Sequence, residues 1–258
     1  MTQHRIVAAC LGLAVLLTGC GDDPVIDDLP SPPPLNGTAF IDPDILTLQD
    51  STAFESVAVL GSGSRDMFDV RTGQVGTYDV WLFRVDFDDA LSLELRVNAE
   101  FDSVSASDLA DLYARRVGLL PNVLREDMAS ISIHDGGDGL GAFDTDMIVH
   151  ADKGEDYRLQ GVLEEVLAHE AVHISLDADH ASSSGWIAAQ QSDQRFISGF
   201  AQEFPQTEDL AETFGAWLGS RWAGDGITDF LRALIENAVP ARLDYLDAQN
   251  FNMHPVGE

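Results

Sequence analysis

Two histidines that stand four residues apart, His169 and His173, have the type and spacing to do chemistry together, and Glu170 directly follows the first of them. Residues i and i+4 lie on one face of a helix, so both imidazoles can reach a single metal ion. The neighbouring carboxylate can then take a proton from water whose pKa a bound zinc ion lowers to about 7. This H-E-x-x-H pattern therefore predicts a metal site that has its own general base.

The helix that must carry this pattern is apolar on most of its surface, as a helix buried beneath a site should be. A histidine on such a helix can also be an ordinary core residue, so a pair of core histidines without any metal is the alternative. The apolar residues flank the motif on both sides and are Val162, Leu163, Val166, Leu167, Ile174 and Leu176.

A catalytic zinc ion usually has three protein ligands, and the sequence offers two sources for the third. In the first, the chain turns back soon after the second histidine and Asp179 is the ligand, with His180 one residue beyond it. Leu176 then stands at the turn, where glycine usually supplies a positive φ that leucine disfavours.

In the second, Glu208 on a separate downstream helix is the third ligand, and Glu212 lies one turn further along the same helix face. Thr207 is a good N-cap, and an acidic first turn complements the helix dipole, which would explain Glu208 without any metal. Glu212 lies one turn further into the helix, where capping and the helix dipole explain it less easily. Ala211 and Gly215 are small, which lets this helix approach the first one closely.

The H-E-x-x-H motif and the E-x-x-A-E run that starts at Glu208 together resemble the gluzincins, which belong to the zincin superfamily of zinc metallopeptidases. The resemblance implies one Zn²⁺ per chain, held by His169, His173 and Glu208. It also implies that Glu170 acts as the general base and that Glu212 supports a zinc-binding histidine from behind. Many gluzincins have Asp where this chain has Glu212.

The N-terminal residues 1–19 are predicted to be a signal peptide, with a short charged start and an apolar stretch. The run Leu-Thr-Gly-Cys that ends at Cys20 resembles a bacterial lipobox, which implies cleavage before Cys20 and a lipid on that cysteine. The alternative is an ordinary signal peptide with an incidental cysteine. Residues 20–36 are rich in Pro and Asp and are predicted to be a disordered spacer.

Composition limits the partners and the redox chemistry. The 258-residue chain has a formal net charge of −30, which argues against nucleic acid and against anionic membrane surfaces as partners. The only cysteine besides Cys20 is Cys10, inside the predicted signal peptide, so the mature chain is expected to contain no internal disulfide. The expected location is the bacterial cell envelope, outside the cytoplasm, with the membrane contacted only through the lipid.

The segment 37–101 is predicted to be a β-rich subdomain. Tyr78–Phe87 and Leu91–Val97 are expected to pair as a hairpin, because the second run alternates apolar and polar residues with period two. Two earlier runs, Val57–Leu60 and Met67–Arg71, are separated by a Gly-Ser-Gly-Ser break.

The segment 102–258 is predicted to be an α+β zincin-like body, a small mixed sheet followed by a mainly helical half. Strands are expected over residues 130–134 and 146–150. The expected helices cover residues 104–128 (interrupted at Pro121), 157–176, 186–204, 208–222 and 228–238.

The gluzincin resemblance also bears on substrate contacts. In zincins an edge strand just before the zinc helix pairs with an extended substrate, and Asp146–His150 occupies that chain position. Zinc peptidases usually need a donor for the oxyanion of the tetrahedral intermediate. Tyr245 and His180 are the candidates by side-chain chemistry, and His254 and Arg242 are further ones.

Taken together, the motifs predict a membrane-anchored, extracytoplasmic zinc metallopeptidase that hydrolyses a peptide or protein substrate. The alternative is a zincin-fold lipoprotein with a binding or envelope-structural role and no peptidase activity. Replacing Glu170 by Gln would abolish the first function and leave the second untouched.

Overall fold

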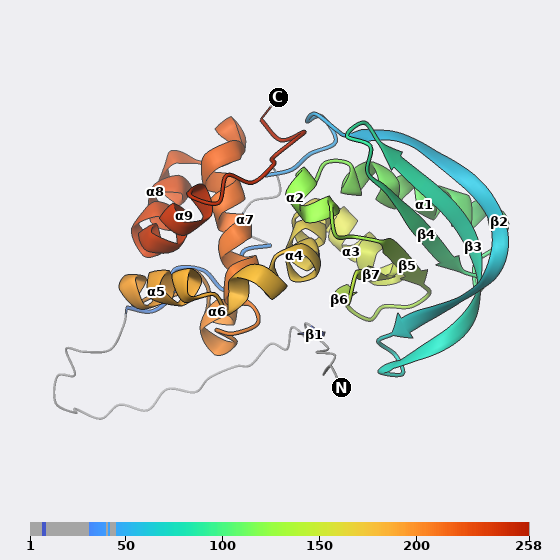
Figure 1. The fold of residues 1–258 in the computed structure, drawn as a ribbon, viewed down its shortest axis with the longest axis horizontal. Helices are drawn as coiled ribbons and strands as arrows, with labels where there is room; N and C mark the ends of the chain where they lie inside the picture. Colours follow the sequence, from blue (N-terminus) through green and yellow to red (C-terminus); the bar gives the residue numbers. More distant parts are fainter. Residues whose placement is uncertain (1–6, 9–30, 40, 42–44, 258) are drawn as a thin grey trace.

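The chain forms an α+β fold in which an N-terminal mixed sheet of six strands is followed by a mainly helical C-terminal half, which confirms the predicted fold class at this level (Figure 1). The computed structural model describes residues 7–8, 31–39, 41 and 45–257. Cys20 and most of the predicted signal peptide and spacer lie outside the described residues. No helix among the described residues is both long and apolar enough to cross a membrane.

The sheet is built from one long hairpin ribbon and a small parallel part. Strands β2, β3 and β4 pair antiparallel, β4 pairs parallel with β5, and β5 pairs parallel with β7. The sheet therefore runs across residue 101, where the sequence analysis divides two subdomains. The strands are β2 (Phe54–Asp69), β3 (Gln74–Phe87), β4 (Ser92–Asn98), β5 (Ser130–His134), β6 (Gly141–Phe143) and β7 (Asp146–His150), and the two-residue β1 (Val7–Ala8) pairs with β6.

The predicted hairpin is confirmed by the β3 and β4 pairing, in which Val85 faces Leu93. The predicted Gly-Ser-Gly-Ser break is wrong, because these residues lie inside the single strand β2. The register shifts between Val59 and Gly61, and Gly61 has a φ of 108°. A bulge absorbs such a glycine without ending the strand, so the chain keeps its pairing where composition predicts a turn.

The predicted edge strand is also wrong. Asp146–His150 forms β7, which lies between β5 and β6 and is buried along its whole length. Both sides of its backbone are already paired, so it has no free edge for a substrate. Between β7 and the outer two-residue strand β1 lies the three-residue strand β6, which is too short to be seen as a periodic pattern in the sequence.

The helices follow the predicted order but are more divided. The predicted zinc helix over 157–176 is two helices, separated by Gly161 with a φ of 75°. The predicted helix over 186–204 also divides, after Gln194 with a φ of 53°. The helices are α1 (Ser103–Val117), α2 (Asn122–Arg125), α3 (Ala151–Gln160), α4 (Leu163–Ser175), α5 (Ser184–Asp193), α6 (Gly199–Glu203), α7 (Asp209–Trp222), α8 (Asp229–Ala238) and α9 (Pro240–Asp247), with a π-helix η1 (Asp177–Ala181) and a 3-10 turn η2 (Gly224–Gly226).

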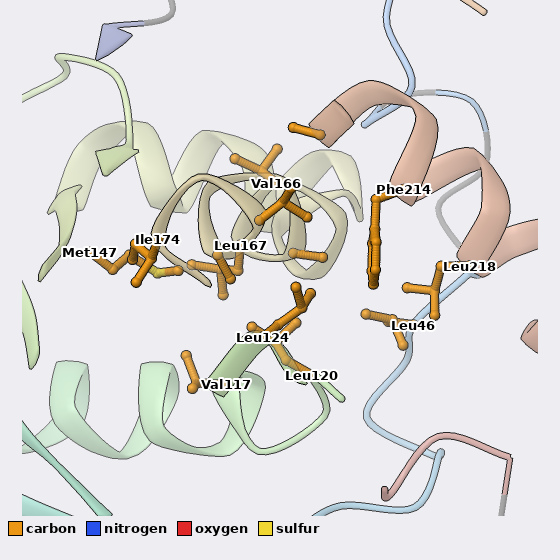
Figure 2. Packing of buried hydrophobic residues seen from close by; sticks show 14 of the residues in the cluster. Leu46, Val117, Leu120, Leu124, Met147, Val166, Leu167, Ile174, Phe214 and Leu218 are labelled. Atoms are coloured by element: carbon orange, nitrogen blue, oxygen red, sulfur yellow. The ribbon is translucent and has the colours of Figure 1, made fainter. Parts of the chain in front are cut away.

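Helix α4 lies at the centre of the molecule, with the sheet on one side and the C-terminal helices on the other (Figure 1). It packs against α1, α2, α3, β7 and α7, and Leu167 on its buried face is fully inaccessible. Figure 2 shows side chains from both halves meeting around this helix. Because apolar contacts hold α4 on several sides, the side chains on its remaining face have a fixed position. The surrounding residues include Val117, Leu120, Leu124, Met147, Phe214 and Leu218.

The last residues of the predicted spacer are not free of the folded body, which corrects the disorder expected up to residue 36. Leu35 forms a parallel β-bridge with Ser198, and its carbonyl accepts a 2.8 Å hydrogen bond from the backbone N–H of Gly199. Arg195 donates to the carbonyl of Pro32 at 2.8 Å. We call residues 34–39 and 41 the strap.

Candidate metal centre

Three predicted ligands meet at one point. The Nε2 atoms of His169 and His173 lie 3.3 Å apart, and Oε2 of Glu208 lies 3.2 Å from the first and 3.3 Å from the second. Ligand atoms bonded to one tetrahedral zinc ion at about 2.0–2.2 Å would be separated by roughly 3.3 Å. This buried group of two imidazoles and one carboxylate therefore could hold a metal ion, and zinc ligation itself stays a prediction.

Local sequence explains how the three side chains come together. Helix α4 presents His169 and His173 on one face because they are four residues apart. Glu208 stands directly before α7 as its N-cap residue, and its own N–H donates to the carbonyl of Phe204 at 2.9 Å. Ala211 on α7 is completely buried, and α7 packs directly against α4.

Asp177 supports His173 and was missed by the sequence analysis. Oδ2 of Asp177 lies 2.9 Å from Nδ1 of His173, so the imidazole can donate its Nδ1–H to the carboxylate and keep Nε2 free for a metal ion. Asp177 lies in η1, in the stretch between the predicted helices 157–176 and 186–204, where no helix was expected. Its i+4 spacing from His173 was the signal that could have found it.

We expect Asp177→Ala to weaken zinc affinity by about 10–100-fold, the usual cost of losing a carboxylate that orients a metal-binding histidine. Competition with a chromophoric chelator would measure the change. Asp179→Ala is the matched control, because Asp179 is exposed in the same helical turn. Equal affinities for the two variants would show that Asp177 does not orient His173.

Glu212 stands beside His169, as the resemblance implied, but not within hydrogen-bonding distance. Its Oε1 is 3.6 Å from Nδ1 of His169, and that nitrogen is buried without a hydrogen-bond partner among the described atoms. The other oxygen, Oε2, accepts a 2.8 Å hydrogen bond from the backbone N–H of Thr38 in the strap. A carboxylate behind an unpartnered imidazole nitrogen is consistent with a metal site on the other side of the ring.

The charges of the two histidines and of Glu208 stabilise one another. Burial lowers the pKa of His173, but hydrogen bonds to Asp177 and Glu208 outweigh it and raise that pKa well above its ordinary value. The pKa of His169 is also raised, since the hydrogen bond to Glu208 overcomes burial. Burial raises the pKa of Glu208, yet the two histidines bring it down to about 2. The carboxylate of Glu208 and the two imidazoles therefore favour one another's charged forms.

Zinc affinity is expected to fall steeply as the pH is lowered, because His169 and His173 must be neutral to bind a metal ion. Their raised pKa values mean that protons compete at a higher pH than the ordinary value of about 6.5 would allow. Calorimetric zinc titrations in buffers of different ionisation enthalpy would count the released protons. Zinc binding at pH 7 without proton release would contradict the raised pKa values.

Glu170 does not belong to the group of three possible ligands, and its surroundings suit a different role. It is buried, it lines a cavity of about 460 Å³ together with His169, and burial raises the pKa of its carboxyl. A raised pKa makes a carboxylate a better proton acceptor near neutral pH. Tyr157 on α3 lines the same cavity, which the sequence analysis did not anticipate.

The rival third ligand, Asp179, does not join the group. The turn that this alternative requires at Leu176 is absent, because Leu176 has a φ of −117° and the chain continues directly into η1. Asp179 is exposed, and among the described residues it lies outside the cluster of possible ligands formed by His169, His173 and Glu208.

The two predicted oxyanion donors, His180 and Tyr245, contact each other rather than the cavity. Nδ1 of His180 lies 2.7 Å from the hydroxyl of Tyr245, and neither residue is among the described residues that line the cavity beside Glu170. Arg242 is fully buried in ion pairs with two aspartates, and His254 pairs with Asp88 at 2.7 Å. These four residues are thus accounted for by contacts within the fold.

A second group of possible ligands among the described residues consists of Asp88, Asp89 and His254. Here the charges are already paired, since Asp89 accepts a 2.7 Å hydrogen bond from Arg125 and Asp88 pairs with His254. The guanidinium of Arg125 already supplies the positive charge beside Asp89.

Comparisons with protein families, curated proteins and solved structures find no match to this chain. Any function must therefore be argued from the geometry and chemistry of the described site. The gluzincin resemblance stays a prediction drawn from the two motifs.

Proposed function

We propose that the protein is a zinc-dependent metallopeptidase. The observation that carries this proposal is the near-equilateral arrangement of His169, His173 and Glu208, at 3.2–3.3 Å, beside a cavity that Glu170 lines. When bound to these three residues, Zn²⁺ would supply Lewis acidity and lower the pKa of a coordinated water to about 7. The remaining chemistry belongs to side chains of this chain.

Glu170 is the proton carrier in this proposal. Its carboxylate accepts a proton from the attacking water and then delivers it to the amine that leaves when the peptide bond breaks. Burial raises the pKa of Glu170, which suits a group that must both accept and release a proton. Asp177 orients the imidazole of His173 through its hydrogen bond, and Glu212 places a carboxylate 3.6 Å behind Nδ1 of His169.

The N-terminal sequence supports a location outside the cytoplasm for this activity. The Leu-Thr-Gly-Cys run that ends at Cys20 supports a lipid anchor on the outer side of a bacterial cytoplasmic membrane or beyond it. Labelling of the expressed protein with a fatty-acid analogue, compared with a Cys20→Ser variant, would test the anchor independently of the metal site.

The experiment that tests the function measures zinc content and cleavage on the same sample. Purified full-length protein should contain one zinc ion per chain by elemental analysis, and it should cleave members of a peptide library in a reaction that a chelator stops and added zinc restores. Zinc without cleavage would favour the non-enzymatic alternative, a binding or envelope-structural lipoprotein. A folded protein that binds no zinc would overturn the proposal.

A further inference from the structure

The strap crosses the face of the molecule where the metal site lies. It lines one side of the 460 Å³ cavity with residues such as Leu35, Ala39 and Ile41, while His169 and Glu170 line the same cavity from α4. This segment precedes β2 in the chain and was predicted to be the end of a spacer and the start of a subdomain. Its position makes it part of the site.

Backbone hydrogen bonds fix the strap at this position. Its carbonyls at Leu35 and Asn36 accept hydrogen bonds from the N–H groups of Gly199 and Phe200 at 2.8 and 3.1 Å. The N–H of Thr38 donates to Oε2 of Glu212 at 2.8 Å. The strap is therefore tied both to the start of α6 and to the carboxylate behind His169.

The two walls of the cavity favour an apolar occupant. Ala39 and Ile41 on the strap share the cavity with Val166 on α4 and Phe200 on α6. None of the described residues that line it is Lys or Arg, and its acidic groups are Glu170 and Glu212. An acidic substrate side chain would find like charges there, whereas a large apolar side chain would be removed from water against matching surface.

We propose that the strap is a specificity-determining wall of the site, and that it selects peptides with a large uncharged apolar side chain next to the bond that is cleaved. A volume of about 460 Å³ lies within the 300–1,000 Å³ typical of small-ligand pockets and accommodates such a side chain. This inference rests on the proposed peptidase function, but its binding component can be measured without any reaction.

The test uses the full-length chain and a series of acetylated pentapeptide amides, Ac-Ala-Gly-X-Ala-Gly-NH₂, in which X is Phe, Leu, Trp, Ala, Asp or Lys. Cleavage rates with the zinc-loaded protein and binding to the metal-free protein, followed by ligand-detected NMR, are compared across the series. We expect Phe and Leu to exceed Ala and Asp by at least about tenfold in both measurements, the usual discrimination of an apolar pocket.

Variants on the two walls show whether the strap is responsible. Ala39→Phe narrows the cavity from the strap and should reduce the preference for Phe, while Phe200→Ala enlarges it from α6 and should shift the preference toward Trp. Ala58→Phe is the matched control, because Ala58 is exposed on β2 and does not line the cavity. Thermal unfolding of each variant checks that the fold is intact.

The outcomes separate this inference from the proposed function. Cleavage without a preference for Phe and Leu, a preference for Lys, or a preference that folded Ala39→Phe retains would overturn the role of the strap and leave the peptidase proposal standing. Selective binding of Phe and Leu peptides that Ala39→Phe abolishes, without cleavage by the wild type, would support the strap as a binding wall while the peptidase proposal fails.

Discussion

Glu170→Gln is expected to reduce peptide hydrolysis by about 10²–10⁴-fold, the usual contribution of a positioned general base, while zinc stays bound. Glutamine has the size of glutamate but cannot accept the proton of the attacking water. Glu170 lines the cavity and lies outside the group of His169, His173 and Glu208, so its loss leaves the proposed ligands unchanged. Steady-state kinetics and zinc content, measured on the same preparation, would check both halves of this expectation.

Glu165→Gln is the matched control for this substitution. Glu165 is a buried glutamate in the first turn of the same helix, its Oε1 accepts a 3.0 Å hydrogen bond from the N–H of Leu46, and it does not line the cavity. The amide oxygen of glutamine can still accept that bond, so activity should change little. If zinc-loaded Glu170→Gln were as active as Glu165→Gln, Glu170 would not be the proton carrier.

The central site was predictable because its geometry is local. An α-helix fixes the separation of residues four apart, so the positions of His169, Glu170 and His173 relative to one another follow from their numbering alone. Glu208 could not be placed by the geometry of this helix. It was predicted because Glu208 and Glu212 stand at the start of a second helix, and capping explains Glu208 more easily than Glu212. The structure brings it to within 3.3 Å of both histidines.

The features that the sequence analysis missed depend on contacts that leave no pattern in the sequence. The strap docks through its backbone, whose hydrogen-bonding groups are the same for almost every residue type, and the Pro- and Asp-rich run that leads into it favoured a prediction of disorder. The three residues of β6 are too few to show a period, so β7 was predicted to be an edge strand. Asp177 was hidden in a π-helical turn that continues α4 where no helix was expected.

Glu208→Ala is expected to lower zinc affinity by more than about a hundredfold, because it removes a direct ligand rather than a supporting group, whose loss costs about 10–100-fold. Glu208, the N-cap residue of α7, is the one proposed ligand that lies outside α4, so the variant also tests whether the second motif serves the first. Zinc content by elemental analysis and affinity by chelator competition would measure the effect.

Two further variants distinguish loss of a zinc ligand from loss of packing at Glu208. Glu208→Gln keeps the volume of the side chain and removes its charge, so a matching loss of zinc would show that the carboxylate and not the packing is required. Asp179→Ala should keep zinc at the wild-type level, because the exposed Asp179 does not reach the histidines. The reverse pattern, with zinc lost from Asp179→Ala and retained by folded Glu208→Ala, would mean that the third ligand is Asp179, in the turn after α4. The two helices would then meet for packing alone, and the gluzincin resemblance would lose its second motif.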